Sequence, residues 1–126
     1  MRKQTTMKVF SVLITVLMVA IFSSWVTAQN EMTNDIRGEA LYEQHCLRCH
    51  GTSGDGNGPD SKFLIVPPAN FQSDESRLKP EWEMLRIISY GIIFSPMHVW
   101  HDRLTDEEML DVLSYIRKIA FLESLT

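Results

Sequence analysis

The chain contains only two cysteines, Cys46 and Cys49, and a histidine, His50, follows the second one directly. A domain of about 100 residues has a thin hydrophobic core and often needs additional stabilisation, for example by disulfides or a bound metal. A disulfide across two intervening residues would close a very small loop, so it would constrain the unfolded chain little. We therefore expect something other than a disulfide to fill the core.

The spacing Cys-x-x-Cys-His is typical of covalent attachment of a c-type haem. Two thiols three residues apart can bond to the two vinyl groups on one porphyrin edge, and the adjacent imidazole can then reach the iron. We predict one haem c per chain, held by Cys46, Cys49 and His50. Three other interpretations stay open: a thioredoxin-like pair, for which a βαβ context is absent, a zinc site completed by His98 or His101, and a simple disulfide.

The N-terminal segment differs from the rest of the chain. Residues 1–8 are basic and contain no acid, residues 9–26 are uncharged and mostly apolar, and the small residues Val-Thr-Ala follow at 26–28. This order is typical of a secretory signal peptide. The uncharged run is also near the length of a membrane span, so an uncleaved N-terminal anchor is the alternative. We predict that residues 1–28 are removed on export.

Export and the haem motif support each other, because bacterial systems attach this haem outside the cytoplasm. We expect a periplasmic or otherwise exported protein, or one anchored in the membrane and facing the periplasm. Loss of three basic residues with the signal peptide changes the net charge from -4 to -7. An acidic chain is a poor nucleic-acid binder, so we expect no nucleic acid partner, and a partner surface that is basic or largely uncharged.

Hydrophobic spacing and end signals predict three helices and no convincing strand, so the expected fold class is all-α. The first helix spans about 35–45 after an N-cap at Asn34, and Gly38 within it suggests close approach of another helix. The second begins at Pro80 and ends at Gly91. Its expected inner face consists of Trp82, Leu85 and Ile88 or Ser89.

The last helix has the clearest start, because Thr105 and Glu108 form a capping box with Thr105 as the N-cap. Its apolar stripe consists of Met109, Val112, Leu113, Ile116, Ile119 and Ala120. Residues 51–59 contain four glycines, which favour a loop. This loop and the segment after it are long for a compact domain, which suggests that they wrap around something.

Taken together, the chain resembles a class I cytochrome c, a small monohaem bacterial type, over about residues 35–120. The family pattern Gly-x-x-x-aromatic-x-x-x-Cys-x-x-Cys-His matches Gly38, Tyr42 and residues 46–50. The resemblance implies a cytochrome c domain at 29–126, with three to five helices and long loops around one covalent haem. It also implies packing of the glycine against the C-terminal helix near Val112, Tyr115 and Ile116.

The resemblance further implies a sixth iron ligand from a later loop, usually methionine. Met97 fits this position, and a thioether ligand stabilises ferrous iron. His98 stands where the family commonly has proline, so His98 could coordinate instead. Coordination by His101 or His45, or an open sixth position, are further alternatives.

Similar cytochromes have a proline after the haem histidine, which suggests Pro59 for the carbonyl that accepts the histidine N–H, with Pro67 as a fallback. By position, Trp100 or Arg103 could hydrogen-bond a haem propionate. Candidates for the apolar haem wall are Phe63, Leu64, Phe71, Trp82, Ile88 and Phe94.

The function that the resemblance implies is that of a single-electron carrier with His50 and Met97 as axial ligands, not an enzyme. Its partners would be redox proteins, with membrane contact only if the N-terminal segment stays uncleaved. One alternative is a haem subunit of a larger membrane-associated or periplasmic oxidoreductase. Another is a haem sensor or peroxidase with an open iron site.

Overall fold

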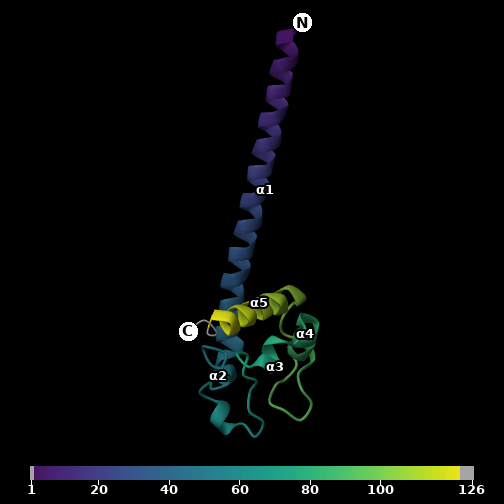
Figure 1. Ribbon diagram of the computed structural model, residues 1–126. Helices are drawn as coiled ribbons and strands as arrows, with labels where there is room; N and C mark the ends of the chain where they lie inside the picture. Colours follow the sequence, from purple (N-terminus) through teal and green to yellow (C-terminus); the bar gives the residue numbers. More distant parts are fainter. Residues whose placement is uncertain (1, 123–126) are drawn as a thin grey trace. The chain divides into compact units, whose positions relative to one another are not determined.

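The computed structural model describes the backbone of residues 2–122 and the side chains of residues 12–21 and 34–122. The chain divides into two units, Met1–Thr33 and Asn34–Thr126. The described residues contain no strand, and the fold is all-α as predicted. In chain order the helices are α1 (Arg2–His45), α2 (Leu47–His50), the 3-10 helix η1 (Ser61–Phe63), α3 (Asp74–Arg77), α4 (Glu81–Tyr90) and α5 (Asp106–Leu122) (Figure 1).

The first unit consists of the N-terminal part of α1, where the side chains of residues 12–21 are exposed. In the described part of the chain, no helix combines the length and hydropathy that a membrane span requires. The predicted cleavage site at 26–28 lies outside the residues whose side chains are described. The predicted N-cap at Asn34 is wrong, since α1 begins at Arg2. No glycine or proline precedes Gly38, so nothing in the sequence interrupts the helix earlier.

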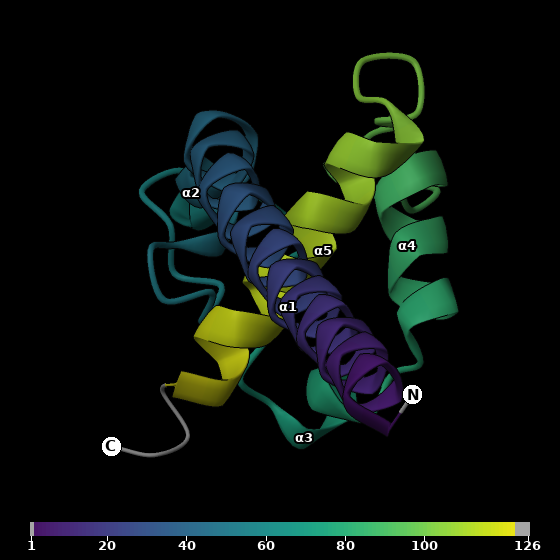
Figure 2. The same cartoon turned by 90° about the horizontal axis from the view of Figure 1, so that it is seen from above.

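The core of the second unit is built around α5. All six residues of the predicted apolar stripe are buried in it. The capping box is also confirmed, because the Glu108 N–H donates to Thr105 Oγ1 at 3.2 Å and the Thr105 N–H donates to Glu108 Oε2 at 2.8 Å. Helix α4 lies beside the N-terminal half of α5 (Figure 2), where the Ser89 hydroxyl is 3.4 Å from Met109 Sδ.

Gly38 lies where α1 crosses α5. A Cβ at this position would collide with the backbone carbonyl of Asp111 and would lie 3.3 Å from Tyr115 Cβ. The aromatic pair Tyr42 and Tyr115 closes the same crossing with ring centroids 5.3 Å apart. Arg37 adds ion pairs to Asp111 and, at 2.8 Å, to Glu107. The expected contact of the glycine with the last helix is therefore present, at Asp111 and Tyr115.

The predicted inner face of α4 is partly wrong. Trp82 is 66% exposed, whereas Met84, Ile88 and Ser89 are buried. Successive helix residues are about 100° apart, so residues two positions apart lie on nearly opposite sides. Since Met84 and Ile88 face α5, Trp82 must face away from it.

Candidate functional site

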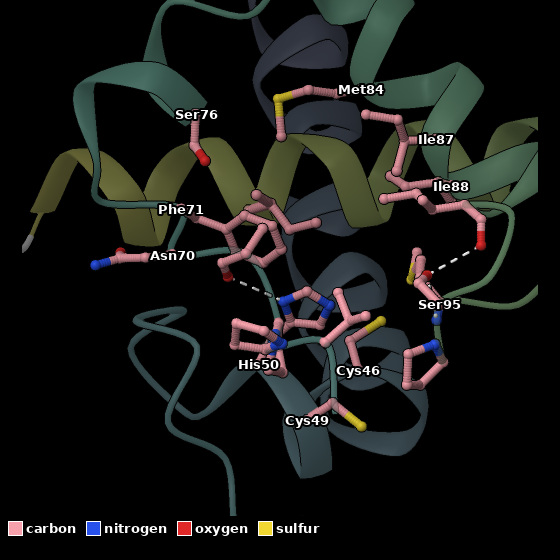
Figure 3. Close-up of a pocket in the computed structure, with 18 of the residues that line it drawn as sticks. Cys46, Cys49, His50, Asn70, Phe71, Ser76, Met84, Ile87, Ile88 and Ser95 are labelled. Atoms are coloured by element: carbon pink, nitrogen blue, oxygen red, sulfur yellow. Dashed lines mark hydrogen bonds between the residues drawn. The ribbon is translucent and has the colours of Figure 1, made fainter. Parts of the chain in front are cut away.

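A cavity of about 420 Å³ lies in the second unit (Figure 3). Its walls come from the end of α1, from α2, from the loops around α3 and after α4, and from α4 and α5. Most of its lining is apolar. Helices α4 and α5 form one side of the cavity, with the side chains of Met84, Ile87, Ile88, Val112 and Ile116. The predicted haem residues Cys46, Cys49, His50 and Met97 all line this one cavity.

The two cysteines and the histidine come from one tight helical turn. The Cys46 carbonyl accepts hydrogen bonds from the Cys49 N–H at 3.1 Å and from the His50 N–H at 2.9 Å. Side chains three residues apart share one helix face, which brings both thiols to the cavity. Figure 3 shows these three residues on the opposite side of the cavity from Met84 and Ile88.

The Cys46 thiol lacks the lowered pKa of a redox-active cysteine. Both cysteines are free, and burial raises the pKa of the Cys46 thiol to about 12. Reactive cysteine pairs usually have a thiol with a lowered pKa. Within the described residues, no group of three or more His, Cys, Asp or Glu side chains could hold a metal ion. The geometry therefore favours neither the thioredoxin-like nor the zinc interpretation.

His50 is held in one orientation with its Nε2 free of a proton. Its Nδ1–H donates to the Ala69 carbonyl at 3.2 Å, so Nε2 keeps the lone pair. The ring stacks on Phe71 with centroids 4.6 Å apart and planes 13° apart. Burial lowers the pKa of His50, and the bond to Ala69 offsets part of this effect. Metal-binding histidines commonly use such a carbonyl to fix tautomer and ring orientation.

The prediction for Pro59 is wrong. Pro59 is exposed and does not line the cavity. The Gly58 N–H bonds to the Cys49 carbonyl at 3.1 Å and the Asp60 N–H bonds to the Arg48 carbonyl at 2.8 Å, which folds this loop onto α2. The chain reaches the imidazole only at Ala69. The fallback Pro67 lines the cavity, but its carbonyl is not the acceptor. No sequence signal marks Ala69.

Met97 lies at the end of a loop that closes on itself. The Ile92 N–H donates to the Met97 carbonyl at 2.9 Å, and the Met97 N–H donates to Ser95 Oγ at 3.1 Å. Gly91 has a positive φ of 67°, which lets the chain turn out of α4. Met97 is half-buried and packs against the core.

The other histidines differ in their access to the cavity. His98 and His45 both line it, with ring centroids 4.6 Å and 5.0 Å from that of Trp100. His98 is exposed, in contrast to Met97. His101 does not line the cavity, and its Nδ1 lies 3.0 Å from the Ser89 carbonyl.

The predicted apolar wall is correct in part. Leu64, Phe71 and Ile88 line the cavity, whereas Phe63, Trp82 and Phe94 do not. Sequence reasoning missed the walls contributed by Met84, Ile87, Leu104, Val112 and Ile116. Most of them would have followed from the apolar stripe of α5 and from the correct choice of which face of α4 is buried. Trp100 lines the cavity, and the Arg103 guanidinium lies 5.7 Å from its ring centroid without lining the cavity itself.

The lining fits a haem. A porphyrin needs apolar walls, and an iron of this type needs an imidazole and a further donor such as a thioether. The cavity supplies these together with the thiols of Cys46 and Cys49. Its charged lining residues, Lys79 and Glu75, pair with each other at 3.0 Å. This donor set in an all-α fold defines a c-type cytochrome.

The comparisons with known proteins agree. The chain belongs to the c-type cytochrome family described as cytochrome C oxidase, cbb3-type, subunit III, whose profile matches residues 33–116. The thiosulfate dehydrogenase of Allochromatium vinosum is 31% identical over 86 residues, which are 64% of this chain and 30% of that protein. The chain thus spans under a third of the length of this curated relative. Membership of the family implies haem-based electron transfer.

A solved structure supports the fold. A chain of the reducing HAO-like protein complex of Kuenenia stuttgartiensis superposes with a TM-score of 0.63 at 22% identity. The match covers 69% of this chain and 44% of that one. The fold is therefore the all-α cytochrome c fold.

Proposed function

We propose that the chain carries single electrons, using one haem c attached through Cys46 and Cys49, with His50 and Met97 as axial ligands. One observation supports this most strongly: these four side chains, from two distant segments, line one cavity. When bound, the haem supplies a one-electron iron couple. His50 presents its Nε2 because Ala69 holds Nδ1–H, and the apolar walls keep water from the site.

Burial favours Met97 over His98 as the sixth ligand. Met97 is half-buried against the core, whereas His98 is exposed and its Nδ1 lies 3.4 Å from the Pro96 carbonyl. The loop that ends at Met97 is closed by its own backbone hydrogen bonds, so binding of the thioether to the iron would require little further ordering of the loop. A methionine ligand raises the reduction potential relative to two histidines.

Covalent attachment is tested on a denaturing gel stained for haem peroxidase activity. We expect the wild-type band to stain and the band of the double variant Cys46→Ala/Cys49→Ala to lose the stain. Leu47→Ala, between the two cysteines, is the matched control and should still stain. Complete extraction of the colour by acidified organic solvent would show that the haem is not covalent.

Ligation by Met97 is tested with Met97→Ala, and His98→Ala is its matched neighbour. We expect Met97→Ala to lose the long-wavelength charge-transfer band of the ferric protein and to bind carbon monoxide when reduced. His98→Ala should keep the band. The reverse pattern would assign the sixth ligand to His98, and ready binding of carbon monoxide by the wild type would indicate an open iron site.

A second candidate function is a haem subunit of a larger oxidoreductase. The relatives favour it, since one is a thiosulfate dehydrogenase and the other is a chain of a reducing HAO-like protein complex. Gel filtration of native extracts, read by haem absorbance, separates the two functions. Elution at the size of the single chain supports a free carrier, whereas co-elution with other subunits supports the second candidate.

Export belongs to the same proposal. Its support is the basic segment, the uncharged run and the small residues at 26–28. The intact mass of the haem-loaded protein tests it: cleavage after Ala28 leaves a chain that begins at Gln29. A chain that retains residue 1 and stays with washed membranes would instead support the N-terminal anchor.

A further inference from the structure

The mostly apolar cavity has one permanent cation in its lining. Among the described residues that line it, Lys79 is the only lysine or arginine and Glu75 is the only carboxylate. The two side chains form an ion pair at 3.0 Å, in which the Lys79 side chain is 25% exposed and the Glu75 side chain is 87% exposed. An ammonium group has three N–H donors, so Lys79 can bind a further acceptor at the cavity.

The backbone that carries Lys79 is anchored to α5. The Arg117 guanidinium donates to three carbonyls of this segment, those of Ser76 at 3.3 Å, Arg77 at 3.0 Å and Lys79. Pro80 follows directly and restricts the chain before α4 begins. Lys79 therefore cannot move away from the cavity unless the bonds to Arg117 break.

The connection between α3 and α4, which contains Lys79, lies across the cavity from the two cysteines. Ser76 and Met84 precede and follow Lys79 in the chain, and both line the cavity. Figure 3 shows these two residues on the opposite side from Cys46 and Cys49. In a haem, the two propionates are attached at the edge opposite the two vinyl groups. Attachment of the vinyl groups to the cysteines would thus direct the propionates toward the side of Lys79.

Charge compensation favours the same pairing. A carboxylate that is withdrawn from water is unfavourable unless it is paired or hydrogen-bonded. Arg103, a candidate from sequence position, does not line the cavity, whereas Lys79 does. Glu75 can give up its ion pair at little cost, because water solvates its exposed carboxylate and exposed ion pairs contribute little to stability.

We infer that Lys79 binds a haem propionate, and that it leaves Glu75 to do so. The inference rests on the proposed haem-carrier function, which it deepens. A propionate carboxylate without a partner would stabilise the positive charge of ferric iron. By neutralising that carboxylate, the Lys79 ammonium raises the reduction potential, which depends on net charge and hydrogen bonding around the iron.

Resonance Raman spectroscopy of the haem-loaded protein tests this inference, because the propionate bending band reports hydrogen bonding to the carboxylate. We expect Lys79→Gln to shift this band to lower frequency and to lower the reduction potential. Lys79→Arg keeps the cation and should keep both properties close to those of the wild type. The visible spectrum should be unchanged in both variants, since neither changes an iron ligand.

Lys62→Gln is the matched control, because it removes the same charge from an exposed residue that does not line the cavity. Its propionate band and its reduction potential should stay at the wild-type values. A band that stays in place in Lys79→Gln would overturn the inference. So would an equal fall of the potential in Lys62→Gln, since the effect would then reflect net charge alone.

Glu75→Gln separates the two possible partners of Lys79. If Lys79 already binds the propionate, the band should stay at its wild-type frequency in this variant. A band that moves in Glu75→Gln but not in Lys79→Gln would show that Lys79 stays paired with Glu75. A band that moves only in Arg103→Gln would assign the propionate to Arg103. Either result would refute the role of Lys79.

Failure of the proposed function has a separate signature. A protein without covalent haem on the stained gel would refute that function before any Raman measurement. A protein with covalent haem and the ferric charge-transfer band, whose propionate band does not respond to Lys79→Gln, retains the proposed function and refutes only the role of Lys79.

Discussion

At the residue scale, Tyr42 connects the haem motif to the core. Its hydroxyl donates to the Gly51 carbonyl at 2.6 Å, directly after His50. The side chain is 1% exposed and packs on Tyr115. Burial, the largest cause, raises the pKa of Tyr42 well above its usual range. This bond fixes the end of α2, and through it the direction of the His50 backbone.

Removing this hydroxyl should destabilise the protein. Tyr42→Phe removes the shorter of two hydrogen bonds to the Gly51 carbonyl, which keeps only the Gly54 N–H at 3.3 Å. Loss of one such bond costs about 0.5–1.5 kcal/mol of the free energy of unfolding. Urea denaturation followed by circular dichroism measures the change. Tyr90→Phe is the control, since Tyr90 is exposed, and it should change the free energy little. Equal effects of the two variants would refute this role of Tyr42.

The same residue predicts a dependence on alkaline pH. Because the folded pKa lies above the unfolded value, the unfolded chain ionises first, and the stability is lost as pH rises above about 10. The loss should be smaller in Tyr42→Phe than in the wild type. Denaturation at several alkaline pH values measures it, and parallel losses in both proteins would contradict the prediction.

At the scale of elements, the crossing of α1 and α5 depends on one glycine. Gly38→Ala would place a Cβ against the Asp111 carbonyl, and backbone cannot yield as a side chain can. Overpacking of this kind costs about 1–3 kcal/mol. Thermal and urea unfolding of the haem-loaded protein measure it. Ala40→Ser, at an exposed position of the same helix, is the control and should leave stability almost unchanged.

The elements also show where sequence patterns are reliable. The capping box and stripe of α5 were predicted correctly because side-chain hydrogen bonds and helical spacing are local properties. The start of α1 and the rotation of α4 about its own axis were not predicted correctly. Trp82 is apolar and fits an inner face by type, but packing of Met84 and Ile88 against α5 decided the rotation of the helix.

At the scale of the whole molecule, the cavity makes folding depend on the haem. When the cavity of about 420 Å³ is empty, its apolar walls are exposed to water or lack packing partners, and either state is destabilising. We expect the Cys46→Ala/Cys49→Ala protein, purified without haem, to keep helical far-ultraviolet dichroism but lose near-ultraviolet dichroism and bind a hydrophobic dye. Cooperative unfolding of that protein with native near-ultraviolet signals would contradict this expectation.

The sequence by itself determined the local features: the thiols and imidazole in one turn, the glycine at a helix crossing, and the cap and stripe of α5. These depend on spacing along the chain, which the amino-acid order states directly. Only the tertiary structure decided that Ala69, not Pro59, holds His50, that Met97 is more buried than His98, and that Phe94 faces solvent. Such contacts join segments far apart in sequence, and their geometry follows from packing around a shared cavity, which no local pattern encodes.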